Sequence, residues 1–560
     1  MTNYQFTGGT ICAPATIPGT GAISIIRVSG KESLAIADKI IDTKGVPIAE
    51  TEGYRLRYGT VFEADGSVLD NVIVSVFRAP HSYTGENSVE ISCHASRFIV
   101  NKILEFLVNA GARIAAPGEF TRRAFVNGKM DLAQAEAVAD VIASQSAASH
   151  RVAMNQLKGG FSSELKVLRE KLLTMTSLLE LELDFSEEDV EFASRKELGQ
   201  LVDDSLTHIR RLTASFSRGN AIKNGIPVAI VGATNTGKST LLNALLGEER
   251  AIVSDIAGTT RDTIEETLNI DGILFRFIDT AGIRETDETI EKIGIDRTFK
   301  KLGEAAVVLG MTDLSRGEAA VLEDADFILS KVNEMGGVKN DGLAIDGAET
   351  GGASLAGTDG TSRSETGVAS LAETGGAPLA ETSRASQHGH GDGQERKVVI
   401  LVNKCDVAGD FYRDDNSTGY GSGNDLGENL AEIGGNKNVN HDNNIVSLIE
   451  NKYDNCKVIP ISAKTGKGLS TLTKALGEIG SEITGSTDET LVTNVRHYEA
   501  LVRAASALDR VRAGLHIATL PPDLIAQDLR EALYHLGEIV GEISTDETLG
   551  NIFRNFCIGK

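Results

Sequence analysis

Residues Gly232 to Thr240 read GATNTGKST, which has the residue types and spacing of a loop that binds nucleotide phosphates. The apolar run IPVAIV precedes this loop and LLNALL follows it, so we expect a strand before it and a helix after it. Glycines let backbone N–H groups face the phosphates, and the N-terminus of the helix adds a partial positive charge. Lys238 is then expected to reach the β- and γ-phosphates, and Ser239 to bind Mg²⁺.

Three further motifs follow in a fixed order. DTAG (279–282) ends the run LFRFI, NKCD (403–406) ends KVVILV, and SAK (462–464) follows VIPI. The carboxylate of Asp406 can accept both N–H donors on the edge of guanine, which adenine does not present. SAK is expected to close over the base. Together the motifs predict that the nucleotide is GTP.

The predicted GTP contacts come from these motifs and from the segment SDIAGTTRD, which lies between the phosphate loop and DTAG. Within it, Thr260 is expected to bind Mg²⁺ together with Ser239. The residues expected to contact GTP are Asn235, Thr236, Gly237, Lys238, Ser239, Thr240, Ser254, Asp255, Ile256, Ala257, Gly258, Thr259, Thr260, Asp279, Thr280, Ala281, Gly282, Asn403, Lys404, Asp406, Ser462, Ala463 and Lys464.

The residue after DTAG limits how hydrolysis can proceed. Many small GTPases have Gln there to orient the attacking water, but here the position holds Ile283, which cannot. The sequence identifies no arginine finger, so another group must neutralise the charge of the transition state. Polar candidates follow at once: Arg284, Glu285, Asp287, Glu288 and Glu291.

The composition is ordinary for a protein of 560 residues, with 41% hydrophobic and 24% charged residues. No run of about 18 apolar residues appears, and the N-terminus lacks the features of a secretory signal, so we expect a cytoplasmic protein without a membrane partner. The net charge of −24 disfavours broad nonspecific binding of nucleic acid but leaves room for a local basic patch. Five scattered cysteines disfavour a disulfide framework and a zinc site.

The periodicity of apolar residues predicts a multidomain chain. Short β-rich runs such as AISIIRVSG and SVEISCH, with one helix near SRFIVNKILEFLVNAG, predict an α+β domain over residues 1–128. Amphipathic helical sequence in 129–223 and again in 487–560 predicts one discontinuous α-helical domain. Between these two parts, residues 224–486 are expected to form an inserted α/β P-loop GTPase domain.

Two segments of low sequence complexity interrupt this GTPase domain, at about 336–395 and 409–445. They are rich in Gly, Ser, Thr, Asn and Asp, so they cannot bury enough apolar area to offset the entropy of the chain. We therefore expect both to be disordered, either as spacers or with a role of their own.

Several longer stretches carry a family resemblance. They are PATIPGTGAISIIRVSG near the front, PGEFTRRAFVNGKMDLAQAEAVADVI at the domain junction, DTAGIRETDETIEKIGIDR in the GTPase part, and the terminal FCIGK. With these, the chain outside the insertions resembles the MnmE (TrmE) family of GTPases, which help to modify the wobble uridine of certain tRNAs.

The resemblance implies that the N-terminal domain is folate-binding-like and drives dimerisation. The implied ligand is 5,10-methylene- or 5-formyl-tetrahydrofolate. Its matching contacts are Arg27, Glu90 and Lys129, with Lys560 nearby. A positive side chain suits the glutamate tail of a folate, and an acidic one suits its pterin edge. The family also places Cys557 near this pocket, where a packing role and a chemical role for its thiol both stay open.

The resemblance further implies a bound K⁺ where other GTPases use an arginine finger, because a cation beside the phosphates offsets developing charge. Glu291 matches the glutamate that positions water, so it is expected to act in catalysis together with Lys238. The matching potassium ligands are Asn235, Ser254, Ile256 and Thr259.

The implied protein is a homodimeric, K⁺-stimulated GTPase that forms a heterotetramer with an FAD-dependent MnmG-type partner and acts on tRNA. The pair would form a (carboxymethyl)aminomethyl group at the 5-position of the wobble uridine, with glycine or ammonium as the amine donor. The alternative is a regulatory GTPase that binds RNA or ribosomes without small-molecule chemistry. The acidic balance and the folate-domain motifs disfavour that alternative.

Overall fold

The computed structural model describes residues 8–184, 195–250, 266–278, 303–334, 396–406, 445–453, 456–485, 489–517, 521–543, 546–554, 556 and 559. The chain divides into two compact units. The first comprises Met1–Ile226, Asn269–Phe275 and Lys474–Lys560, and the second comprises Pro227–Leu268 and Arg276–Thr473. Within the described ranges, every helix is too short or too polar to span a bilayer.

A seven-stranded sheet forms the N-terminal part of the first unit. In spatial order its strands are β3 (Ile41–Asp42), β4 (Arg55–Phe62), β5 (Val68–Phe77), β6 (Ser88–His94), β2 (Ile23–Ser29), β1 (Ile11–Pro14) and β7 (Arg113–Ile114). Neighbouring strands are antiparallel except β1 and β7, which are parallel. A short 3-10 helix, η1 (Ile48–Glu50), precedes β4.

One face of this sheet forms the core of the N-terminal part. The helices α1 (Ser33–Ile40) and α2 (Arg97–Asn109) contribute apolar side chains to the same buried cluster as alternate residues of β5 and β6, such as Val74 and Ile91. Side chains alternate between the two faces of a strand, so the intervening residues lie on the other face. The expected α+β domain is therefore confirmed.

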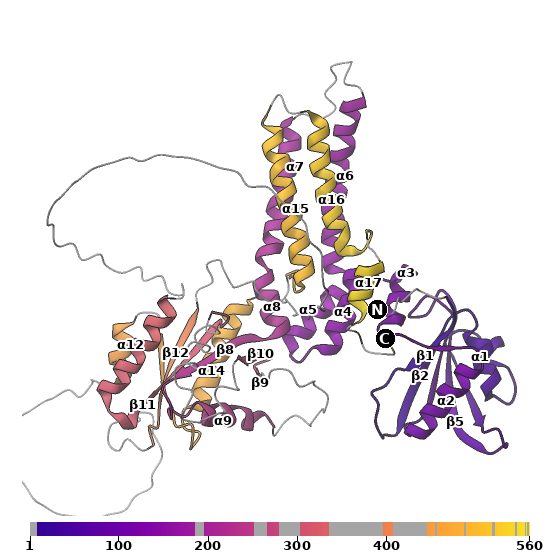
Figure 1. The fold of residues 1–560 in the computed structure, drawn as a ribbon, viewed down its shortest axis with the longest axis horizontal. Helices are drawn as coiled ribbons and strands as arrows, with labels where there is room; N and C mark the ends of the chain where they lie inside the picture. The colour runs from indigo at the N-terminus through magenta and orange to yellow at the C-terminus, as the bar shows by residue number, and fades with distance from the viewer. Residues whose placement is uncertain are drawn as a thin grey trace, which may run out of the picture. The chain divides into compact units, whose positions relative to one another are not determined.

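A bundle of helices forms a second part of the first unit. Its members are α3 (Glu119–Val126), α4 (Leu132–Ala143), α5 (Ala147–Leu157), α6 (Gly160–Asp184), α7 (Arg195–Ala214), α8 (Phe216–Asn224), α15 (Val495–Leu515), α16 (Pro522–Val540) and α17 (Asp546–Arg554). The helices α6 and α7 precede the second unit in sequence and α15 and α16 follow it, yet all four share one core (Figure 1). This confirms the discontinuous helical domain.

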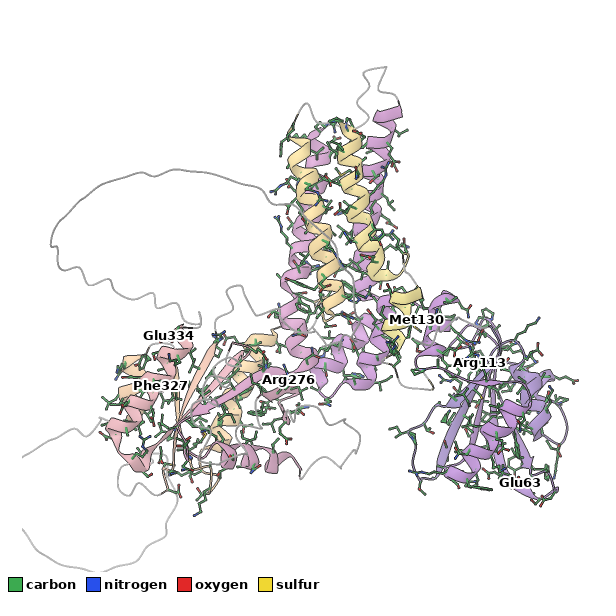
Figure 2. All side chains as sticks on the ribbon, viewed as in Figure 1. Glu63, Arg113, Met130, Arg276, Phe327 and Glu334 are labelled. Atoms are coloured by element: carbon green, nitrogen blue, oxygen red, sulfur yellow. The ribbon has the colours of Figure 1, made fainter. Side chains whose placement is uncertain are left out.

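The junction between the sheet and the bundle has a small core of its own. Met130, labelled in Figure 2, follows α3 and packs, partly buried, in a cluster with Leu132 and Phe553. Asp131 caps α4, because its side chain accepts a hydrogen bond from the N–H of Gln134 at 2.8 Å. The last of the described helices, α17, therefore packs where the bundle begins.

A six-stranded sheet carries the nucleotide motifs. Its spatial order is β13 (Cys456–Pro460), β12 (Lys397–Asn403), β11 (Val307–Asp313), β8 (Ile226–Gly232), β10 (Ile273–Ile278) and β9 (Glu266–Ile270). The strands β8, β11, β12 and β13 are parallel, so their carboxyl ends meet at one edge. Its other elements are α9 (Lys238–Arg250), η2 (Leu314–Arg316), α12 (Glu318–Glu334), α13 (Ile445–Lys452) and α14 (Leu469–Thr484).

The central strands of this sheet are buried on both faces. The strand β11 is fully buried, and Val308 packs with Val321 and Ile328 of α12 in one cluster. Phe327 and Glu334, labelled in Figure 2, also belong to α12. Parallel strands with helices between them confirm the inserted α/β domain. The segments 336–395 and 409–445 lie outside the described residues, apart from Ile445, where α13 begins.

Candidate functional site

The phosphate loop lies where β8 ends and α9 begins, as its flanking apolar runs predict. Three of its residues have a positive φ, Gly232 with φ +157°, Asn235 with φ +62° and Gly237 with φ +99°. A Cβ atom on Gly237 would lie 2.4 Å from Nδ2 of Asn403, so no larger residue fits there. Glycine is therefore required at this position for two reasons: the backbone is left-handed, and the end of β12 lies too close for a side chain.

The side chain of Lys238 makes hydrogen bonds within the phosphate loop. Its Nζ donates to the carbonyl oxygen of Gly232 at 2.9 Å and to that of Ala233 at 2.8 Å. Burial lowers the pKa of the Lys238 amine. The amine therefore lies at the N-terminus of α9 among oxygen acceptors that the phosphates of a nucleotide can replace.

Asn403, the last residue of β12, connects the phosphate loop to the loop after β13. Its Nδ2 donates to the carbonyl oxygen of Thr236 at 2.6 Å, and its Oδ1 accepts from the N–H of Ala463 at 3.0 Å. Asn403 and Thr236 are both buried. We expected Asn403 among the GTP contacts, and the structure shows that its amide joins two of the nucleotide loops to each other.

The SAK segment forms a tight turn after β13. The N–H of Ser462 donates to the carbonyl oxygen of Lys467 at 2.9 Å, and its Oγ accepts from the N–H of Thr465 at 3.2 Å. Lys464 and Asp406 are exposed. Because β12 and β13 are adjacent and parallel, the loops that follow them lie at one edge of the sheet and can contact the same base.

The predicted cation ligands that the structure describes fit in type. Ser239, in the first turn of α9, offers a hydroxyl, and Asn235 offers an amide oxygen; hard cations prefer such oxygen donors. Thr240 is exposed in the same turn. The predicted site residues that lie outside the described residues are Ser254, Asp255, Ile256, Ala257, Gly258, Thr259, Thr260, Asp279, Thr280, Ala281, Gly282, Arg284, Glu291, Cys557 and Lys560.

A second candidate site lies on the N-terminal sheet. Arg27 of β2 and Glu90 of β6 are direct cross-strand neighbours. The Nε and Nη2 atoms of Arg27 lie 2.9 and 2.8 Å from Oε1 of Glu90. Because the two head groups touch, any ligand that contacts one of them at this place would meet the other at the same end. Their residue types alone had suggested one for the tail of a folate and the other for its pterin edge.

Two aromatic residues that the sequence analysis missed surround Arg27. The guanidinium carbon lies 5.3 Å from the ring centroid of Tyr83 and 5.7 Å from that of Phe120. The hydroxyl of Tyr83 is 2.8 Å from Oγ1 of Thr121. The pKa of Tyr83 is raised, because the effect of burial outweighs the hydrogen bond with Thr121 and the charge of Arg27, which both lower it. Their occurrence in the glycine-containing stretches HSYTGEN and PGEF is the only local signal for them.

Lys129 lies beside the same loop that carries Tyr83. Its exposed Nζ donates to the carbonyl oxygen of Pro80 at 3.1 Å. A Cβ atom on Gly85 would lie 3.3 Å from Cγ of Lys129. The loop between β5 and β6 thus contacts both of the basic side chains predicted for a folate, Arg27 through Tyr83 and Lys129 through Pro80 and Gly85.

The end of the chain returns to this site. Nη1 of Arg27 donates to the carbonyl oxygen of Gly559 at 3.4 Å, across 532 positions of sequence. Gly559 is buried, and a Cβ atom there would lie 2.0 Å from the carbonyl oxygen of Pro14. A cation, a carboxylate and aromatic rings at one place suit a flat ligand that carries both hydrogen-bonding edges and negative charge, which is the chemistry of a folate.

Comparisons with known proteins cover both sites. A family model described as the MnmE helical domain matches residues 132–557, and one described as the GTP-binding protein TrmE N-terminus matches residues 10–129. The tRNA modification GTPase MnmE of Parabacteroides distasonis is 44% identical over 98% of this chain and 100% of its own. The MnmE of Bacteroides thetaiotaomicron is 43% identical over 98% of this chain and 99% of its own. The MnmE of Porphyromonas gingivalis is 42% identical over 100% of this chain and 99% of its own.

Proposed function

This chain belongs to the MnmE family of tRNA modification GTPases, and from that premise we propose that it couples GTP hydrolysis to the modification of the wobble uridine of certain tRNAs. The observation that carries the proposal is the ion-paired, aromatic-lined site at Arg27, which a GTPase acting only as a switch does not need. We propose that this site holds a one-carbon tetrahydrofolate, which supplies the carbon of the new group at the 5-position.

The GTPase site would work through residues of this chain in distinct roles. Lys238 would exchange its two carbonyl partners for phosphate oxygens, and Asp406 would accept the two N–H donors of guanine. Ser239 and Thr260 would hold Mg²⁺, and Glu291 would orient the attacking water. A potassium ion, when bound, supplies positive charge beside the phosphates. Its proposed ligands are Asn235, Ser254, Ile256 and Thr259.

The cation assignment has a direct test. GTP turnover by the full chain should be faster in K⁺ than in Na⁺ buffer at equal ionic strength. Asn235→Ala should remove this difference while nucleotide binding is retained. Equal rates in the two buffers for the unaltered protein would contradict the assignment.

The folate site would use Arg27 and Glu90 as one recognition unit and Lys129 as a second, separate point of contact. Lys560 is proposed for the same pocket, and Cys557 as a neighbour that packs or reacts. The carbonyl oxygen of Gly559 already accepts a hydrogen bond from Nη1 of Arg27. The C-terminal segment would therefore form part of the wall around the ligand.

We propose that two copies pair through the N-terminal sheet. Support comes from its face turned away from α1 and α2, where Leu56, Tyr58 and Ile73 are exposed. Tyr58 and Ile73 are direct cross-strand neighbours on β4 and β5, so the apolar side chains form one patch. Tyr58→Arg should shift the molar mass measured by light scattering from dimer to monomer, and an unchanged mass would refute this surface.

The proposed dimer would join an FAD-dependent MnmG-type protein in a heterotetramer. That assembly would form the (carboxymethyl)aminomethyl group on tRNA, with glycine or ammonium as the amine source. A tRNA substrate also favours the cytoplasm as the compartment of the reaction.

The decisive experiment is mass-spectrometric nucleoside analysis of tRNA from cells that lack this protein. The wild-type gene should restore the 5-substituted uridine, whereas Lys238→Ala and Arg27→Ala should not. Purified Arg27→Ala should still bind and hydrolyse GTP, which separates the two sites. Full restoration by Arg27→Ala, or an unaltered uridine in the deletion strain, would favour a regulatory GTPase without small-molecule chemistry.

A further inference from the structure

Asp313 ends β11 at the sheet edge that carries the nucleotide loops, yet it belongs to none of the GTPase motifs. Its Oδ2 accepts a hydrogen bond from Nζ of Lys404 at 2.6 Å. Its Oδ1 accepts from the N–H of Ser315 at 3.0 Å and from the Oγ of Ser315 at 2.6 Å. Both carboxylate oxygens of a buried aspartate are therefore in use, one for the adjacent turn and one for a lysine of NKCD.

The register of the sheet produces this contact. Asp313 and Asn403 are paired positions on the parallel strands β11 and β12. Lys404 follows Asn403 and has a left-handed backbone, with φ +66°. From there its side chain reaches Asp313, while Asn403 reaches the phosphate loop. Two consecutive side chains of NKCD thus contact two different neighbouring elements.

The ion pair is positioned to stay formed at neutral pH. Burial opposes ionisation of Asp313, but the hydrogen bonds from Lys404 and Ser315 and the charge of Lys404 outweigh it and lower the pKa of Asp313. Asp313 holds the ammonium of Lys404 at one place, and the Lys404 side chain as a whole is about one-third exposed.

We propose that Asp313 is a positioning residue for the guanine base: it fixes the ammonium end of Lys404, so that the methylene stem of Lys404 is held beside the base site formed by NKCD and SAK. The inference rests on the proposed assignment of Lys404 to the nucleotide. A lysine stem carries several rotatable bonds, and fixing it before the ligand arrives removes an entropy cost from binding. The effect falls on nucleotide affinity, because Asp313 contacts neither the phosphate loop nor Lys238 in the bonds described above.

The test uses the full chain and a fluorescent GDP analogue, with GTP turnover measured in parallel. Asp313→Ala should raise the Kd of the analogue and the KM for GTP about tenfold, while kcat at saturating GTP changes less than about twofold. Asp313→Asn retains an acceptor for the Ser315 turn and keeps the side-chain volume. It should therefore weaken binding by a smaller factor, and it serves as a second variant if Asp313→Ala is poorly folded.

The coupling to Lys404 is what separates positioning from a purely structural role. In a Lys404→Ala background, Asp313→Ala should cause little further loss of affinity, because the side chain that it orients is already absent. An undiminished loss in that background, or an unchanged Kd in the single Asp313 variants, would overturn the inference. If Lys404→Ala alone leaves the Kd unchanged, the assignment of Lys404 to the base site fails, and the inference fails with it.

A second lysine–aspartate pair in the same unit provides a control. Asp326 of α12 accepts from Nζ of Lys452 at 2.7 Å and also bonds the hydroxyl of Tyr453, away from the nucleotide loops. Asp326→Ala removes a lysine–aspartate pair that is more exposed than the Asp313–Lys404 pair, so it should leave both Kd and kcat unchanged. An increase in Kd as large as that of Asp313→Ala would show that the assay reports general loosening of the domain, and would count against positioning.

Discussion

The side-chain Nδ2 of Asn403 lies 2.6 Å from the main-chain carbonyl oxygen of Thr236, while Oδ1 of the same amide accepts from the N–H of Ala463. One buried side chain therefore holds the phosphate loop and the SAK turn to the end of β12. The nucleotide loops are interdependent as a result, since displacing any one of them breaks a buried hydrogen bond that another needs.

Asn403→Ala should weaken binding of both GTP and GDP and destabilise the domain by about 2–4 kcal/mol, because it leaves the Thr236 carbonyl and the Ala463 N–H buried without partners. Titration with a fluorescent nucleotide and urea unfolding measure the two effects. The control is Asn224→Ala at an exposed position of α8, which should change stability by less than about 0.5 kcal/mol. Unaltered nucleotide affinity in Asn403→Ala would contradict the role given to this amide.

Gly237→Ala should abolish nucleotide binding, since the added Cβ would lie 2.4 Å from Nδ2 of Asn403 and the backbone is left-handed. Gly247→Ala in α9 is its matched control, because nothing lies within 4 Å of a Cβ atom there. In a helix, alanine is favoured over glycine by about 1 kcal/mol, so Gly247→Ala should bind nucleotide normally and unfold at the same or a higher temperature. Equal binding by the two variants would refute the steric argument.

Arg27→Ala should lower the affinity of the full chain for 5-formyl-tetrahydrofolate at least about tenfold, because it removes the ion pair with Glu90 and the cation beside two aromatic rings. Isothermal titration calorimetry reports the affinity. Arg55→Ala removes an exposed pair with Glu52 on the same sheet and should have no effect. A folate titration that the Arg27 change does not alter would remove this residue from the proposed site.

Glu136→Gln should reveal a pH-dependent contribution to stability in the helical bundle. The carboxylate of Glu136 on α4 accepts from Arg496 at 3.0 Å and from Nε2 of His497 at 2.6 Å, both on α15. Burial opposes its ionisation, but the charges and hydrogen bonds of His497 and Arg496 outweigh burial and lower the pKa of Glu136 from its ordinary 4.5 to about 2.

A carboxyl group whose pKa is lower in the folded than in the unfolded protein stabilises the folded state. Its full contribution is present at any pH above the pKa of the unfolded protein. That stabilisation is lost as the pH falls from about 4.5 toward 2. Urea unfolding should therefore show a difference between wild type and Glu136→Gln of about 3 kcal/mol at neutral pH, shrinking below pH 4.5. The control is Glu180→Gln, which removes a half-exposed pair with Arg530. A difference that persists undiminished at pH 2 would contradict the assigned cause.

Asp406→Asn should shift the preference of the enzyme from GTP toward xanthosine triphosphate, because the carboxylate that we propose accepts two guanine N–H donors becomes an amide that donates. The shift is measured by letting each of the two nucleotides compete with a fluorescent GDP analogue for the nucleotide site. Asp406 is exposed, so the variant should fold normally. A retained preference for GTP would place the base contact elsewhere.

Much of the fold follows from local properties of the sequence. The alternation in SVEISCH and the helical spacing in RHYEALVRAASALDRVRAGL correctly predict β6 and α15, since these periods reflect the geometry of one element and its buried face. The phosphate loop could also be predicted from local sequence, because the spacing of its glycines and the apolar runs of the preceding strand and the following helix lie close together in the chain.

The side-chain partners were not predictable in this way. Asn403 meets Thr236, Asp313 meets Lys404, and Arg27 meets Gly559 across 532 positions, and each contact depends on how distant strands and termini are placed. Residue type limits what a side chain can bind, so the sequence by itself determined the nucleotide motifs, the charges and the periodic faces. Only the tertiary structure decided which donor meets which acceptor, because strand register and the return of the C-terminus bring together groups that no local pattern connects.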